Sequence, residues 1–172
     1  MFAKILCVFT TVFLTVSSTA SKLSVQGNKM LLDNVYLNKG TPAEGLLINS
    51  RMIQGISDGF TNWPYPDTKK WNATRNTQEF VNNMATWRSK GLNAFTVGMQ
   101  GGSPKIGSSG YKNSAFNSDG SLVPDYMDRL KLILNKSNEL NMIVIISMFY
   151  RSQVAHFKTY NNALKGATNL LE

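Results

Sequence analysis

Five side chains stand at positions where a parallel α/β fold gathers chemically active groups. Arg51 interrupts one apolar run, and Gln100 and Tyr150 directly follow two others. The carboxyl ends of parallel strands meet at one edge of a sheet, so we expect these groups to lie together there. Trp63 and Tyr65 belong to the first long loop, where aromatic rings can stack on the apolar faces of pyranose sugars. These five residues are the candidate ligand contacts.

Some of these assignments have alternatives that the sequence leaves open. Prolines lie beside Trp63 and Tyr65, and the two rings can equally pack as the core of their own loop. Arg51 can be a ligand contact or a structural cation.

A pair of carboxylates can supply acid, base and nucleophile in hydrolysis. Only Asp58, Asp67 and Asp119 lie on loops at the same edge, and loop aspartates more often form turns. We therefore expect no catalytic residue among them. His156 is the single histidine, and no ligand spacing indicates a metal. The glycines at 101–102 lack phosphate-binding spacing, so no cofactor is expected.

A repeated helix–strand unit positions the candidate residues. Residues 80–90 predict an amphipathic helix and 92–99 an apolar strand, and residues 126–140 and 142–149 repeat the plan. Short, continuously apolar strands that follow helices are typical of parallel sheets. Residues 45–56 predict a first, less regular parallel strand.

Residue types at the helix ends support this reading. Asn76 with Glu79 resembles a capping box at the start of the first helix, and Pro124 suits the first turn of the second. Gly91 and Asn141 are expected to end the two helices.

The remaining elements are a hairpin over residues 23–37, long loops over 57–75 and 100–123, and a third helix over 159–171. The faces expected to be buried are Phe80, Val81, Met84 and Trp87 in the first helix, Tyr126, Leu130, Ile133 and Leu134 in the second, and Tyr160, Ala163, Leu164, Ala167 and Leu171 in the third.

Loop lengths favour one α/β architecture. The loops that follow the strands are long, whereas the helix-to-strand returns are single residues. Tight strand–helix turns are usual in small doubly wound sheets, whereas long upper loops suit a barrel enzyme. A TIM (β/α)8 barrel needs about 250 residues. We therefore predict a partial barrel, with an N-terminal hairpin and about three βα units, and no linker.

The N-terminus predicts a secretory signal peptide over residues 1–20. Lys4 precedes an apolar stretch at 5–16, and small residues at 18–20 suit cleavage. A membrane anchor is the alternative. We expect residues 21–172 to be a secreted, extracellular domain that no longer contacts a membrane. Cys7, the only cysteine, would leave with the signal, so no disulfide is expected.

The positive charge does not indicate a nucleic-acid partner. The formal net charge is +8, with 18 basic and 10 acidic residues. The basic residues are scattered and form neither a dense run nor an arginine-rich stripe, which nucleic-acid binding requires.

Two triplets match the N-glycosylation sequon, at Asn72-Ala73-Thr74 and at Asn135-Lys136-Ser137. In an exported eukaryotic protein they would place both segments at the surface.

An ordered series of segments resembles exported, cellulase-like glycoside hydrolases with a (β/α)8 barrel, related to family 5. It covers nearly all of residues 44–153: EGLLINSRMIQG at 44–55, WPYPD at 63–67, RNTQEF at 75–80, WRSKGLNAFT at 87–96, QGGSP at 100–104, NSAF at 113–116, DGSL at 119–122, and 142–150 with Gln153.

The resemblance implies hydrolysis of O-glycosidic bonds in a carbohydrate, by an acid/base glutamate after the fourth strand and a nucleophilic glutamate after the seventh. Neither position is expected within these 172 residues. The chain would then be the N-terminal fragment of a glycosidase. The alternatives are a secreted carbohydrate-binding protein without catalysis, or a truncated gene product without activity.

Overall fold

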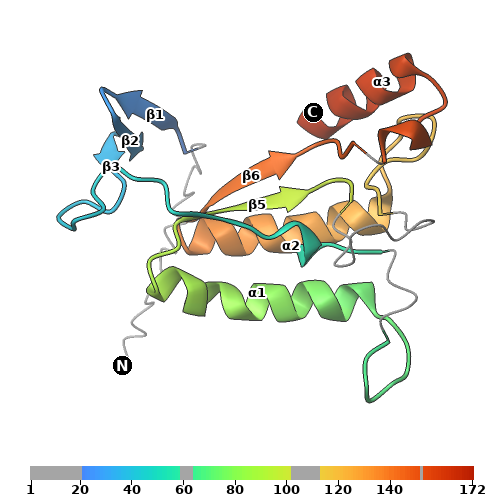
Figure 1. The fold of residues 1–172 in the computed structure, drawn as a ribbon, viewed down its shortest axis with the longest axis horizontal. Coiled ribbons are helices and arrows are strands. Elements are labelled where there is room, and N and C mark those ends of the chain that lie inside the picture. Colours follow the sequence, from blue (N-terminus) through green and yellow to red (C-terminus); the bar gives the residue numbers. More distant parts are fainter. Residues whose placement is uncertain (1–20, 59–63, 102–112, 152) are drawn as a thin grey trace, which may run out of the picture. The chain divides into compact units, whose positions relative to one another are not determined.

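The computed structural model describes residues 21–58, 64–101, 113–151 and 153–172. The chain divides into two compact units, residues 1–46 and residues 47–172. The described residues form two three-stranded sheets and three α-helices, so the protein is of the mixed α/β class (Figure 1).

The first unit contains an antiparallel sheet. Its strands are β1 (Leu23–Gln26), β2 (Lys29–Leu32) and β3 (Val35–Tyr36), in the order β1-β2-β3. Gly27 adopts a φ of 61° in the first turn, a conformation that glycine reaches without strain. The predicted hairpin is confirmed.

The second unit contains a parallel sheet in the order β4-β5-β6. Its strands are β4 (Asn49–Arg51), β5 (Ala94–Gly98) and β6 (Ile143–Ser147). The apolar runs at 92–99 and 142–149 therefore form strands as predicted, each shorter at both ends.

The first parallel strand is much shorter than the predicted range of 45–56. β4 has only three residues, and a single 3-10 turn (Ile53–Gly55) follows it. Arg51 and Met52 are the last residues held by β5: Arg51 lies opposite Thr96, and the backbone N–H of Met52 donates to the Thr96 carbonyl at 2.8 Å. The chain then turns toward the first helix.

The three helices are α1 (Ala73–Ser89), α2 (Pro124–Glu139) and α3 (Tyr160–Leu171). Figure 1 shows α1 and α2 side by side along one face of the sheet. Pro124 occupies the first turn of α2, as predicted. Gly91 (φ 96°) and Asn141 (φ 49°) end α1 and α2 in the left-handed conformation, which confirms the expected ends.

The predicted start of α1 is wrong. Asn72, not Asn76, is the N-cap: its backbone is extended, and its Oδ1 accepts a hydrogen bond of 2.9 Å from the backbone N–H of Arg75. Asn76 lies inside the helix and donates through Nδ2 to the carbonyl of Gln54 at 3.0 Å. The helix therefore begins earlier because a better-placed asparagine precedes the predicted one.

The core of this unit lies between the sheet and the inner faces of α1 and α2. Met84, Tyr126 and Ile133 are fully buried there, as predicted. Leu134 is 37% exposed, contrary to prediction. α2 also buries two polar residues, Arg129 and Ser137, and the spacing of Arg129 from Tyr126 places it on the inner face.

The predicted buried face of α3 is also wrong in part. Tyr160, Leu164 and Leu171 are exposed, and the helix buries Ala163 and Gly166. Small residues face inward because α3 packs closely on the loop near Phe116 and Gly120, where a side chain at Gly166 would touch the Phe116 ring.

The two faces of the parallel sheet differ in burial. Phe95 and Val97 point toward the helices and are 0% exposed. In the strand register Arg51, Thr96 and Ile145 share the other face, where Arg51 is exposed and Ile145 is 36% exposed. Parallel sheets are normally covered on both faces. We call this second face the open face, because no described element covers Arg51 and Ile145 there; Ile146, which shares the helical face with Val97, is itself 37% exposed.

Candidate functional site

The residues that follow β5 and β6 are joined directly. Oε1 of Gln100 accepts a hydrogen bond of 3.2 Å from the backbone N–H of Tyr150, and Nε2 of Gln100 lies 3.3 Å from Oγ of Ser114. Gln100 is 1% exposed, whereas Tyr150 is 39% exposed. Of this predicted pair, Gln100 is therefore a buried residue, whereas Tyr150 is partly exposed at the surface.

Gly101 supports the ring of Tyr150. Its φ is 81°, and a Cβ at this position would lie 2.6 Å from Cγ of Tyr150. Only glycine allows both this backbone conformation and this approach of the ring.

Asn113 connects the segments that follow all three parallel strands. It is 0% exposed, and its Nδ2 donates to the carbonyls of Gly101 at 2.6 Å and Ile56 at 3.2 Å. Its Oδ1 accepts from the backbone N–H of Asp58 at 3.0 Å, and its own N–H donates to Oε1 of Gln153 at 3.3 Å. Asn113 therefore links the segments that follow β4, β5 and β6 at the carboxyl ends of the strands.

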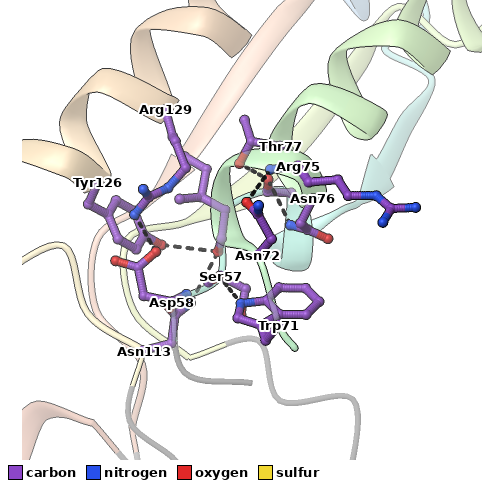
Figure 2. Close-up of polar contacts among 12 residues, drawn as sticks. Ser57, Asp58, Trp71, Asn72, Arg75, Asn76, Thr77, Asn113, Tyr126 and Arg129 are labelled. Carbon is purple, nitrogen blue, oxygen red and sulfur yellow. Dashed lines mark hydrogen bonds and ion pairs between the residues drawn. The ribbon is translucent and has the colours of Figure 1, made fainter. Parts of the chain in front are cut away.

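Asp58 and Arg129 form an ion pair beside this junction (Figure 2). Tyr126 donates through its hydroxyl to the Gly98 carbonyl at 2.7 Å. Arg129 is 7% exposed. Burial raises the pKa of the Asp58 carboxyl, and the Arg129 charge opposes that shift. The pair attaches the loop after β4 to helix α2.

The other two loop aspartates have separate partners. Asp67 pairs with Arg75 at 2.7 Å, and this bond lowers the pKa of the Asp67 carboxyl. Asp119 accepts hydrogen bonds from Ser121, at 3.0 Å from the backbone N–H and 2.7 Å from the hydroxyl, and these lower its pKa. Each of the three aspartates thus has a partner within the described part of the chain.

Tyr65 is engaged within its own loop. Its ring lies parallel to Trp71 at a centroid distance of 5.6 Å, and the Arg75 guanidinium lies 3.9 Å from its centroid. Its hydroxyl donates to Oε2 of Glu79 at 3.1 Å, and burial together with this bond raises the pKa of the phenol. These contacts favour the loop-core alternative for Tyr65. Trp63 lies outside the described residues.

Arg51 lies at the end of β4 on the open face of the sheet. Its position is compatible with either predicted role. Of the four candidates that the structure describes, Arg51 and Tyr150 are therefore the exposed ones, Arg51 on the open face and Tyr150 beyond the carboxyl end of β6.

Sequence reasoning did not predict the roles of Asn113, Tyr126 and Arg129 in this network. The burial of Arg129 was predictable, because it lies three residues after Tyr126 on the apolar face of α2. A buried guanidinium needs a charged or hydrogen-bonding partner. Asn113 had none beyond the apolar residues that follow it.

The described residues contain no group of three or more potential ligands that could hold a metal ion. No helix among them is both long and apolar enough to cross a membrane. Comparison of the chain with protein-family models, curated proteins and solved structures finds no match.

Proposed function

We propose that this chain forms the first part of a secreted glycoside hydrolase of the (β/α)8 class, which binds a carbohydrate at the carboxyl ends of β4, β5 and β6. In this proposal Tyr150 and Arg51 contact the sugar, Gln100 positions Tyr150, and the catalytic carboxylates come from strands beyond these three.

The observation that carries the proposal is the convergence of all three strand ends on one hydrogen-bonded junction. Asn113 holds the loops after β4 and β5 together, and Gln100 holds Tyr150 against the end of β5. Active sites of parallel α/β proteins lie at this end of the sheet. A rigid junction beneath an exposed aromatic ring suits recognition of a sugar, whose C–H faces pack on aromatic rings.

The open face of the sheet supports the barrel part of the proposal. In a (β/α)8 barrel helices cover the outside, and the other face of the sheet lines the interior. Here α1 and α2 take the helical face, and Arg51, Thr96 and Ile145 occupy the face that would line the barrel.

A second candidate is a secreted carbohydrate-binding protein without catalysis. It is favoured by the separate partners of the described loop aspartates: Arg129 for Asp58, Arg75 for Asp67 and Ser121 for Asp119. A retaining or inverting glycosidase needs two carboxyl groups facing one glycosidic bond.

Two measurements separate these candidates. Secreted protein is titrated with soluble β-glucan oligosaccharides by calorimetry, and release of reducing ends is followed. Transcripts are read beyond codon 172, and any longer product is assayed in the same way. The hydrolase proposal predicts a longer product with a glutamate after the fourth strand, whose replacement by glutamine abolishes turnover. Binding without turnover in every product supports the second candidate, and no binding to any glycan contradicts both.

Variants of one residue type test the assigned surface. We expect Tyr150→Ala to weaken binding about tenfold, which corresponds to about 1.4 kcal/mol of ring contact, and Tyr150→Phe to retain it. Tyr160→Ala is the matched control, because Tyr160 is 79% exposed on α3. Equal effects at both tyrosines would contradict the assignment.

A further inference from the structure

The two glycosylation sequons occupy different structural settings. Asn72 is exposed, has an extended backbone (φ −134°, ψ 105°) and precedes α1, and Thr74 is exposed in the first turn. Asn135, Lys136 and Ser137 all lie within α2. Ser137 is 3% exposed, and its Oγ donates to the Ile133 carbonyl at 2.7 Å.

We propose that Asn72 is the acceptor of an N-linked glycan and that Asn135 is not. This inference rests on the export part of the proposed function. Transfer requires an accessible hydroxyl residue two positions after the asparagine. At Asn72 that residue is Thr74, and the first turn of a helix opens easily because its N–H groups lack helical partners. At Asn135 the C-terminal turns of α2 would have to leave the core to expose Ser137, which is 3% exposed and donates to the Ile133 carbonyl.

The cap at Asn72 is compatible with the modification. Oδ1 of Asn72 accepts the hydrogen bond from Arg75, as Figure 2 shows, whereas a glycan attaches to Nδ2. The donor is a lipid-linked oligosaccharyl pyrophosphate. The sugar C1–O bond to the pyrophosphate breaks, a C1–Nδ2 bond forms, the lipid pyrophosphate leaves, and the amide releases one proton. The helix cap therefore survives the reaction.

The glycan would stand beside the candidate site. Asn72 directly follows Trp71, whose Nε1 donates to the Ser57 carbonyl at 3.0 Å, next to the Asp58–Arg129 pair (Figure 2). The modified side chain thus lies near the same end of the sheet as Asn113.

The test is secretion of the full chain from eukaryotic cells, followed by intact-mass measurement before and after treatment with peptide N-glycosidase. We expect one glycan on the unaltered chain, none on Thr74→Ala, and one on Thr74→Ser and on Asn135→Gln. Thr74→Ala is chosen because it removes the sequon and leaves the Asn72 cap intact. Two glycans on the unaltered chain, or one that survives Thr74→Ala, would overturn the proposal.

A second version, with a known signal peptide in place of residues 1–20, separates this inference from export. If the natural chain stays inside the cell but the second version carries a glycan at Asn72, export by residues 1–20 fails and the glycan assignment holds. If the second version is secreted without a glycan, the assignment is refuted whatever residues 1–20 do.

Discussion

The backbone N–H of Tyr150 donates a hydrogen bond of 3.2 Å to the side-chain oxygen of Gln100. The two residues are 50 positions apart, and each directly follows the apolar run that forms its parallel strand. Through this bond the buried side chain of Gln100 holds the backbone of Tyr150, which is partly exposed. Gln100 therefore functions in the candidate site by positioning Tyr150.

Replacing Gln100 tests that support. Gln100→Ala leaves the N–H of Tyr150 without its side-chain acceptor, so we expect the free energy of unfolding to fall by about 1–3 kcal/mol. Chemical denaturation measures the loss. Gln78→Ala is the matched control, since Gln78 is exposed on α1 and its Nε2 donates to Oδ1 of Asn82, which is also exposed. A loss no larger than that of Gln78→Ala would contradict the role of Gln100.

Replacing Gly91 and Gly101 by alanine distinguishes the cost of backbone strain from the cost of a steric clash. Gly91 and Gly101 both have positive φ, but a Cβ at Gly91 meets nothing within 4 Å, whereas one at Gly101 meets the Tyr150 ring. Gly91→Ala should destabilise by about 1 kcal/mol through strain alone. Gly101→Ala should destabilise more and should also change the near-ultraviolet circular dichroism of Tyr150. Equal losses at the two sites would show that the ring does not lie on Gly101.

Two aspartates should respond to pH with opposite signs. The folded pKa of Asp58 is raised above 3.8 by burial, so its contribution to stability is present below 3.8 and is lost as pH rises through the folded pKa. The folded pKa of Asp67 is lowered below 3.8 by the hydrogen bond from Arg75, so its contribution is present above 3.8 and is lost as pH falls.

The comparison uses unfolding free energies of the unaltered chain relative to Asp58→Asn and to Asp67→Asn, across the acidic range. Relative to Asp58→Asn the unaltered chain should lose stability as pH rises above 3.8, and relative to Asp67→Asn it should gain stability as pH rises toward 3.8. If both stability differences changed with pH in the same direction, the pKa shifts assigned to Asp58 and Asp67 would be refuted.

The open face of the parallel sheet should make the isolated chain self-associate. Among the described residues β6 pairs only with β5, which leaves its other edge unpaired there, and Ile145 on β6 is 36% exposed. Ile145→Lys should reduce association, as measured by sedimentation. Leu164→Lys, at a 54% exposed position on α3, introduces the same charge away from the strand edge. An equal reduction by both variants would indicate a general charge effect.

Local patterns predicted the elements of this fold well. Pro124 and Asn141 delimit α2, and the apolar runs that follow Gly91 and Asn141 form β5 and β6. These features succeed because helix ends and buried strands are determined by nearby residues. The start of α1 failed because Asn72 and Asn76 are both good caps, and the choice depends on the loop that Arg75 and Asp67 fix.

The candidate site was predictable only in outline. Gln100 and Tyr150 were placed at strand ends correctly, but their hydrogen bond depends on the register of β5 and β6, which spacing alone does not give. Asn113 could not be found at all, since its partners lie up to 57 residues away. Ligand contact remains a prediction for all five candidates: Arg51, Trp63, Tyr65, Gln100 and Tyr150.

The most direct measurement of the central claim is an NMR titration of the secreted, isotope-labelled protein with a soluble β-glucan oligosaccharide. Binding at the carboxyl ends of the strands predicts shift changes at the amides of Tyr150 and Gly101 and at the Arg51 side chain, and those at Gly101 and Arg51 should need about ten times more oligosaccharide in Tyr150→Ala. Shift changes confined to the outer faces of α1 and α2, or none at saturating oligosaccharide, would contradict it.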